Sequence, residues 1–145
     1  MIECATQANG AVYDLHVFHL GNRDYLVAGI NAHVKVYWME SDVPELDERA
    51  EIDSQIICYK IKVEIDREGE QARILVADIM KSLSIYRFSR SQERLQIEAR
   101  DPNGLWCIEM AKVPFKQDKA ETEEWDVEED DEQLDNDFYL TADFD

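Results

Sequence analysis

The side chains that could bind a metal ion or attack a substrate are few and lie far apart along the chain. The histidines are His16, His19 and His33. His16 and His19 are separated by a spacing that, on a strand, places them on opposite faces, so they cannot easily share one metal ion. No cysteine is near any histidine in the sequence. A zinc site is therefore not expected.

The cysteines Cys4, Cys58 and Cys107 form no C-x-x-C pair, and their number is odd. This pattern favours free thiols in a reducing compartment over a disulfide framework. The sequence also lacks the nucleophile elbow G-x-S-x-G, the P-loop and the glycine-rich dinucleotide motif. We therefore expect a protein without enzymatic activity, without a cofactor and without a metal site.

Charge is concentrated in one segment. Residues 118–137 contain twelve Asp or Glu and one Lys, so −11 of the net charge of −18 lies there. Such a block repels itself and nucleic acid, and is typical of a solvated loop. The D-x-D-x-D-G spacing of a calcium loop is missing. With 15 Lys and Arg against 33 Asp and Glu, no basic face is indicated, so this segment is not expected to contact DNA or RNA directly.

Alternation of apolar and polar residues is the main pattern in the remaining chain, and it predicts strands. No segment of ten or more residues shows a convincing helical period. No apolar run approaches the roughly 20 residues needed to span a bilayer. The predicted fold class is all-β. The predicted strands are 11–18, 25–31, 33–39, 49–53, 56–63, 73–79, 82–88, 94–99, 105–111 and 138–143.

A hairpin sequence occurs twice. The stretch "YLVAGINAHVKVYW" at 25–38 is similar to "ILVADIMKSLSIYRF" at 74–88. The two stretches align with one constant spacing of 49 residues. The aligned residues are 26–28 with 75–77, Ile30 with Ile79, Val34 with Leu83, Val36 with Ile85, and Tyr37 with Tyr86. Asp78, at the link of the second copy, is expected to cap the turn by accepting backbone N–H groups.

The strands group in fours, which predicts a partial β-propeller. A repeat of about 40–45 residues with four strands is typical of a propeller blade. A single four-stranded sheet cannot bury both faces without a neighbour on each side. Because propellers close with roughly four blades or more, we expect about two and a half blades of a larger ring. The predicted organisation is 1–10 as the end of a preceding element, 11–53 and 56–100 as blades, and 104–145 as an incomplete blade with an acidic loop at 116–137.

Four ordered motifs resemble a known family. They are "GAVYDLHVF" at 10–18, "LVAGINAHVKVYW" at 26–38, "ILVADIMKSLSIYRF" at 74–88 and "IEARDPNGLWCIEM" at 97–110. They resemble the third propeller of the cullin-RING ubiquitin ligase adaptors, the family of the large subunit of the damage-specific DNA-binding protein. Similar blades occur in two relatives, the largest subunit of the cleavage and polyadenylation specificity factor and a large subunit of splicing factor 3b. A scaffold of pre-mRNA 3′-end processing or splicing, labelled as nucleic-acid binding, is therefore the alternative.

The resemblance implies a nuclear protein-interaction scaffold that acts in DNA repair and protein ubiquitination, with the cytoplasm as a second compartment. In this family the first and third propellers form a cleft that receives a helical segment of a substrate receptor, and the second propeller holds the cullin. This matches helix-in-groove recognition. The implied partners are substrate receptors and the cullin ligase, which bind through the parent protein. No contact with a membrane is implied.

The resemblance also implies a set of receptor-binding residues. Carried over position by position, they are Ala11, Tyr13, Ile57, Tyr59, Ile79, Lys81, Arg100 and Trp106. Three positions depart from the family pattern. Lys81 stands where arginine is usual, Ile57 where methionine is usual, and Lys60 where an aromatic residue is usual. Lysine cannot make the bidentate fork of arginine, so the choice of receptor is left open.

Each of these residues also has a structural interpretation. Tyr13, Tyr59 and Trp106 fit packing between blades, which uses aromatic residues as interfaces do. Ile79 fits burial inside the blade. Arg100 fits a turn with a local ion pair. The sequence leaves these alternatives open.

Overall fold

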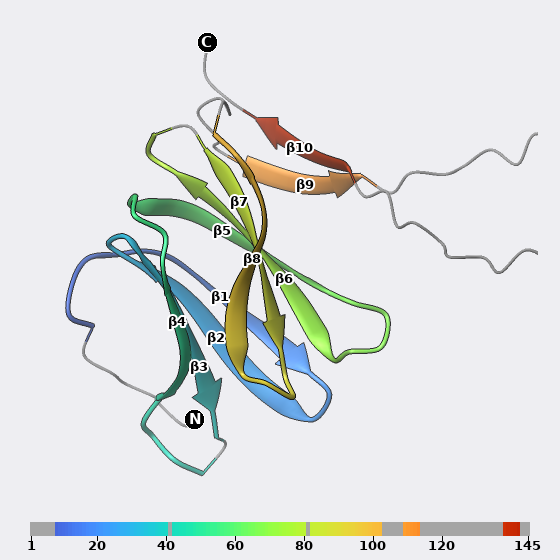
Figure 1. Ribbon diagram of the computed structural model, residues 1–145. Helices are drawn as coiled ribbons and strands as arrows, with labels where there is room; N and C mark the ends of the chain where they lie inside the picture. Colours follow the sequence, from blue (N-terminus) through green and yellow to red (C-terminus); the bar gives the residue numbers. More distant parts are fainter. Residues whose placement is uncertain (1–7, 41, 81, 103–108, 114–137, 143–145) are drawn as a thin grey trace, which may run out of the picture.

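The computed structural model describes residues 8–40, 42–80, 82–102, 109–113 and 138–142, and every regular element in it is a strand (Figure 1). The first sheet contains β1 (Val12–Leu20), β2 (Arg23–Ile30), β3 (His33–Met39) and β4 (Asp47–Asp53). The second contains β5 (Cys58–Ile65), β6 (Gln71–Asp78), β7 (Leu83–Ser89) and β8 (Arg94–Asp101). A third pair is β9 (Glu109–Val113) with β10 (Phe138–Ala142). Within each sheet, strands that follow one another in the sequence pair antiparallel, and the all-β prediction is confirmed.

Each predicted strand overlaps an observed one, with differences at the ends. The fourth begins at Asp47, before the predicted start at residue 49, and the ninth is described only from Glu109. The whole of the predicted acidic loop, residues 116–137, lies outside the described residues. Within the described part of the chain, no helix is long and apolar enough to cross a membrane.

The two four-stranded sheets pack face to face around one shared core. The two sheets lie closest together where β1 faces β5. They are in looser contact between β4 and β8, so they spread apart toward their last strands. Three aromatic rings pack at the centre of this core. The ring centroid of Tyr25 lies 5.5 Å from that of Phe18 and 5.2 Å from that of Phe88. A large apolar side chain buried in this way contributes about 1.5–3 kcal/mol. Each sheet therefore stabilises the other.

Both faces of the central hairpins are apolar, as expected of a sheet with a neighbour on each side. In β6, the consecutive residues 74–78 are all buried. The face of this sheet that points away from the shared core is covered by Met110 of β9, which packs on Leu75 and Ala77. Lys62 Nζ on β5 donates to the Met110 carbonyl at 2.6 Å. The β9–β10 pair thus lies on the second sheet in the way that the second sheet lies on the first.

The repeat is real, and the spacing of 49 residues holds for its second strand, where the bulges at Val36/Tyr37 and Ile85/Tyr86 match, but the first strand is offset by 48 residues. Val27 pairs with Val36, whereas Val76, which the constant spacing matches with Val27, pairs with Ser84. The link between β6 and β7 is longer than the link between β2 and β3: β2 ends at Ile30 and β3 begins at His33, whereas the Asp78 N–H of the second hairpin bonds to the Ser82 carbonyl, with one more residue between the partners. Because side chains alternate between faces, a shift of one residue reverses which face they occupy. Val27 and Val76 accordingly lie on opposite faces of their own sheets and both point into the shared core, whereas Tyr37 and Tyr86 lie on equivalent faces.

Candidate functional site

Those predicted site residues that the structure describes gather at one end of the two sheets, which Figure 1 shows at the upper left. We call it the upper end. It is formed by the starts of β1 and β5, the β2–β3 and β6–β7 turns, and the end of β8. These segments meet because alternate strands of an antiparallel sheet start at the same end.

Backbone hydrogen bonds join the two sheets across the upper end. Asn31, whose φ is 53°, donates its N–H to the Ala11 carbonyl at 3.0 Å, and its side chain Oδ1 accepts the Ala11 N–H at 3.1 Å. The Asn31 carbonyl accepts the Cys58 N–H of the second sheet at 3.0 Å. Farther along, the Ile79 N–H donates to the Ile57 carbonyl at 3.2 Å. The structure thus places Ala11, Ile57 and Ile79 along one connected edge.

Two equivalent β-bulges expose the tyrosines. In β1, Val12 pairs with Ile30 and Asp14 with Gly29, so Tyr13 is the extra residue. In β5, Tyr59 occupies the same place, between two residues that pair with consecutive residues of β6. A bulge redirects side chains and is common beside functional sites. Tyr13 is 44% exposed and Tyr59 45% exposed, so neither is packed in the core that the two described sheets share.

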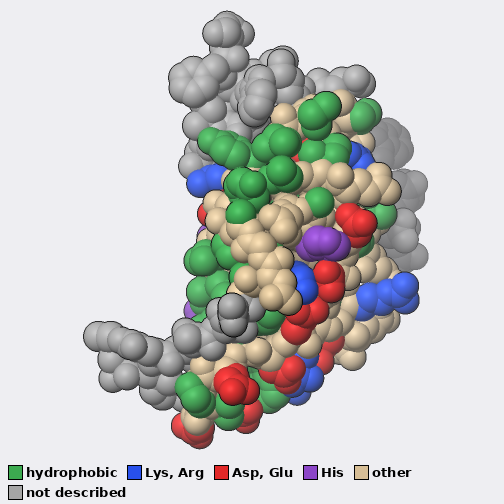
Figure 2. Space-filling view, turned by 90° about the vertical axis from the view of Figure 1, so that its left-hand side faces the viewer, with side chains coloured by type: hydrophobic (Ala, Val, Ile, Leu, Met, Phe, Trp, Pro, Cys, Tyr) green, Lys and Arg blue, Asp and Glu red, His purple; other side chains and the backbone are tan. Residues whose placement is uncertain are grey.

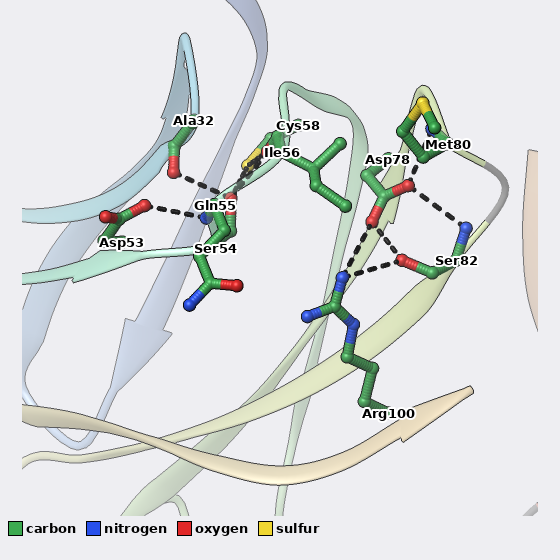
Figure 3. Close-up of polar contacts among 10 residues, drawn as sticks. All are labelled: Ala32, Asp53, Ser54, Gln55, Ile56, Cys58, Asp78, Met80, Ser82 and Arg100. Carbon is green, nitrogen blue, oxygen red and sulfur yellow. Dashed lines mark hydrogen bonds and ion pairs between the residues drawn. The ribbon is translucent and has the colours of Figure 1, made fainter. Parts of the chain in front are cut away.

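The β6–β7 turn is held by Asp78, whose side chain is only 6% exposed (Figure 3). Its Oδ1 accepts the Met80 N–H at 2.9 Å and the Ser82 N–H at 3.1 Å, and its Oδ2 accepts the Ser82 hydroxyl. The predicted capping role of Asp78 is confirmed. Arg100 lies in β8 rather than in a turn, and its guanidinium is 3.8 Å from Asp78 and 3.4 Å from the Ser82 hydroxyl.

A buried polar group supports the start of β5. The Ser54 hydroxyl lies 2.7 Å from the carbonyls of Ala32 and Ile56, and 3.1 Å from Cys58 Sγ (Figure 3). Cys58 is a free cysteine, as predicted; it is fully buried, and burial raises the pKa of its thiol. Cys4 and Cys107 lie outside the described residues. The neutral thiol fills the core below the upper end.

The upper end has a substantial apolar surface. Figure 2 looks onto the left-hand side of the view in Figure 1 and shows hydrophobic side chains gathered in its upper part, above a band of acidic and basic ones. The most exposed large apolar residue at this end is Met80, at 67%. Ile57 and Ile79 are half-buried beside it. Sequence reasoning missed Met80, although its place in the predicted hairpin link indicated an exposed apolar residue.

The electrostatics of this surface are local. One Asp14 carboxylate oxygen accepts the Ile61 N–H of the second sheet at 2.8 Å and lies 3.9 Å from Lys60 Nζ. Among the residues that the structure describes, no three His, Cys, Asp or Glu side chains come together as a metal site would need. What this arrangement offers is an exposed surface of apolar and aromatic side chains. Lys81 and Trp106, the remaining predicted members, lie outside the described residues.

Comparison with known proteins gives one finding. The family model of the CPSF A subunit region matches residues 4–118. No curated protein matches the chain. The matched residues include both four-stranded sheets and the whole upper end. With its repeated four-stranded sheets, this chain belongs to the CPSF A subunit region family of propeller-type scaffolds.

Proposed function

We propose that this chain is a propeller segment of a non-enzymatic cullin-RING ligase adaptor, and that its upper end binds a helical segment of a substrate-receptor protein. The observation that carries the proposal is the pair of matching bulges, which expose Tyr13 and Tyr59 at the same end of the sheets as the exposed Met80. Tyrosine is enriched among residues that dominate binding energy. An amphipathic helix places its apolar anchors on a surface of this kind.

The residues have distinct proposed roles. Tyr13 and Tyr59 supply large apolar area with a hydroxyl at the tip, which suits a partly wet interface. Ile57 and Ile79, which are half-buried, supply apolar contact between them. Arg100, held beside Asp78, offers N–H donors at the border of the apolar area. By resemblance, Ala11, Lys81 and Trp106 complete the surface.

The wider role follows the resemblance. We propose that the parent protein works in the nucleus, with the cytoplasm as a second compartment, in DNA repair and protein ubiquitination. It connects substrate receptors to a cullin ligase, requires no cofactor, and performs no chemistry itself. The strong negative charge of the chain argues against direct contact of this segment with nucleic acid.

The test is binding of the full chain to a helical peptide taken from a ligase substrate receptor. Tyr13→Ala and Tyr59→Ala are each expected to weaken the affinity by a factor of about 10 or more, as truncation of a dominant contact does. Ile97→Ala is the matched control, since Ile97 is also exposed but lies on the outermost strand β8. Failure of the peptide to bind, or an equal loss in the control, would contradict the proposal.

The second candidate is a scaffold of pre-mRNA 3′-end processing. The family match supports this role as well as the ligase role, because the CPSF A subunit region gives the family and does not distinguish between its members. Binding to purified pre-mRNA cleavage factors, with no binding to the receptor peptide, would select it. A steep fall of RNA affinity with salt would instead indicate direct contact with the phosphate backbone.

A further inference from the structure

The opposite end of the two sheets, the lower end, contains a polar pocket of about 580 Å³. It lies between the β1–β2 turn of the first sheet and the β5–β6 and β7–β8 turns of the second. The lining residues are Asn22, Arg23, Glu70, Arg90, Ser91, Gln92 and Glu93. This pocket has no part in the proposed receptor binding, which belongs to the upper end.

Glu93 ties the two sheets together beside this pocket. Its carboxylate accepts Arg23 Nη1 at 3.0 Å, Arg49 Nη1 at 3.2 Å and the Tyr25 hydroxyl at 3.3 Å, all from the first sheet. Glu93 has a φ of 46°, a conformation that is uncommon for residues other than glycine. In this turn the Glu93 N–H donates to the Ser89 carbonyl at 2.8 Å, which closes the turn.

Arg90 is the second cation of the pocket. Its Nε donates to Glu70 Oε2 at 3.1 Å, and its Nη2 donates to Glu70 Oε1. The same guanidinium lies against the β1–β2 turn, since a Cβ added to Gly21 would be 2.1 Å from Arg90 Nη1. Arg23 and Arg90 therefore approach the pocket from different sheets, and each is paired with one carboxylate. The four charged lining residues sum to zero.

Ser91 is the hydroxyl of this lining. It is exposed, and its Oγ lies 2.9 Å from the Ser89 Oγ. Ser91 stands between Arg90 and the turn residues that lead to Glu93. A phosphoserine carries close to two negative charges at neutral pH and three strong acceptor oxygens, and it makes charge-assisted hydrogen bonds where arginine side chains are at hand. The arginine fork suits phosphate better than a lysine would.

We propose that Ser91 is a phosphorylation site and that Arg23 and Arg90 bind the phosphoryl group in the lower-end pocket. In the modification, Ser91 Oγ attacks the γ-phosphorus of ATP held by a Ser/Thr protein kinase. The Oγ–P bond forms, the bond from that phosphorus to the bridging oxygen breaks, ADP leaves, and the hydroxyl proton passes to the base of the kinase. The pocket changes from neutral to strongly anionic, and the phosphate replaces Glu93 as the partner of Arg23 and Glu70 as the partner of Arg90.

The first experiment tests accessibility. The full chain is treated with ATP and Ser/Thr kinases that select arginine before the target residue, and the phosphorylated position is located by mass spectrometry. Phosphate on Ser91 of the folded chain, absent in Ser91→Ala, is the expected result. Labelling of Ser91 only after unfolding in urea would overturn the proposal, because the folded turn would then be closed to kinases.

The second experiment tests the arginine contacts. Phosphoserine is incorporated at position 91 during translation, and its second pKa is measured by phosphorus NMR. In the folded chain this pKa is expected to fall below the ordinary value of about 6, and to return toward it in urea and in Arg23→Gln. Arg23→Lys, which keeps the charge and loses the fork, is expected to give an intermediate value. A pKa that stays at the ordinary value in the folded chain would refute the binding of the phosphate by the arginines.

Discussion

Replacing Asp78 with alanine should destabilise the protein more than its place in a surface turn suggests. The carboxylate is almost fully buried and accepts the Ser82 N–H, the Met80 N–H and the Ser82 hydroxyl. Hydrogen bonds to a charged group contribute about 1.5–3 kcal/mol each, and a buried donor left without a partner costs about 1–3 kcal/mol.

These contributions do not simply add. The N–H of the exposed residue Met80 can bond to water when the carboxylate is gone, whereas the N–H of the buried residue Ser82 cannot. We therefore expect Asp78→Ala to lower the free energy of unfolding by about 3 kcal/mol. Asp78→Asn keeps one acceptor oxygen for the backbone and should lose about half of that. Ser82→Ala removes only the hydroxyl bond and should cost about 1 kcal/mol.

The assay is urea unfolding of the full chain followed by tryptophan fluorescence, with the slope against urea checked for constancy. The order of the three variants is the informative result. If Asp78→Ala costs no more than Ser82→Ala, the backbone bonds of the carboxylate contribute nothing and the capping argument is wrong. A loss of this size is a large part of the roughly 5–15 kcal/mol that stabilises a domain, so the order is measurable.

Other predictions concern the contact between the sheets. Gly29→Ala should lower the free energy of unfolding by about 1–3 kcal/mol, because the new Cβ would lie 2.9 Å from Cys58 Cβ and 3.4 Å from the Cys58 carbonyl oxygen. An unchanged urea midpoint would show that the two sheets can move apart to accept the new methyl group. Burial raises the pKa of the Cys58 thiol above its ordinary value of 9.0, so the unfolded state releases this proton first as the pH rises. The contribution of the neutral Cys58 thiol to stability is therefore complete below about pH 9 and is lost as the pH rises through the folded-state pKa. Urea midpoints measured from pH 7 to 10 should consequently fall less steeply with pH in Cys58→Ala than in the unchanged protein. Parallel curves for the two proteins would contradict this expectation. Glu93→Gln should cost about 1 kcal/mol in thermal unfolding by weakening the bonds from Arg23 and Arg49, and an equal loss in a variant of the exposed residue Gln92 would show that the effect is not specific.

Much of the fold could be predicted from the sequence. Apolar residues on both faces of 26–30 and 74–78 required strands with a neighbour on each side; the structure provides both neighbours for 74–78, whereas Ala8 and Leu46 pack on the outer face of the first sheet. The capping role of Asp78 could also be predicted, because an aspartate at a hairpin link bonds to backbone groups only a few residues away. Interactions as local as these depend on residue type and order alone.

The candidate site was less predictable. Tyr13 and Tyr59 came from the resemblance to known motifs, and residue type did not distinguish an interface from packing. Arg100 looked like part of a turn, because its partner Asp78 is distant in the sequence and meets it only when β8 lies beside β7. Glu93 carried no signal in the sequence at all, since its three donors come from the other sheet.

By itself, the sequence determined which segments are strands, that the strands repeat in fours, and that the sheets must be stacked, because apolar periodicity and burial are properties of each strand. The tertiary structure decided the register of the second hairpin, the two bulges that turn Tyr13 and Tyr59 outward, and the clamp of Glu93 between the sheets. A shift of one residue in strand pairing leaves the composition of the strand unchanged but moves every side chain to the opposite face of the sheet. The packing of the assembled sheets therefore selects the register.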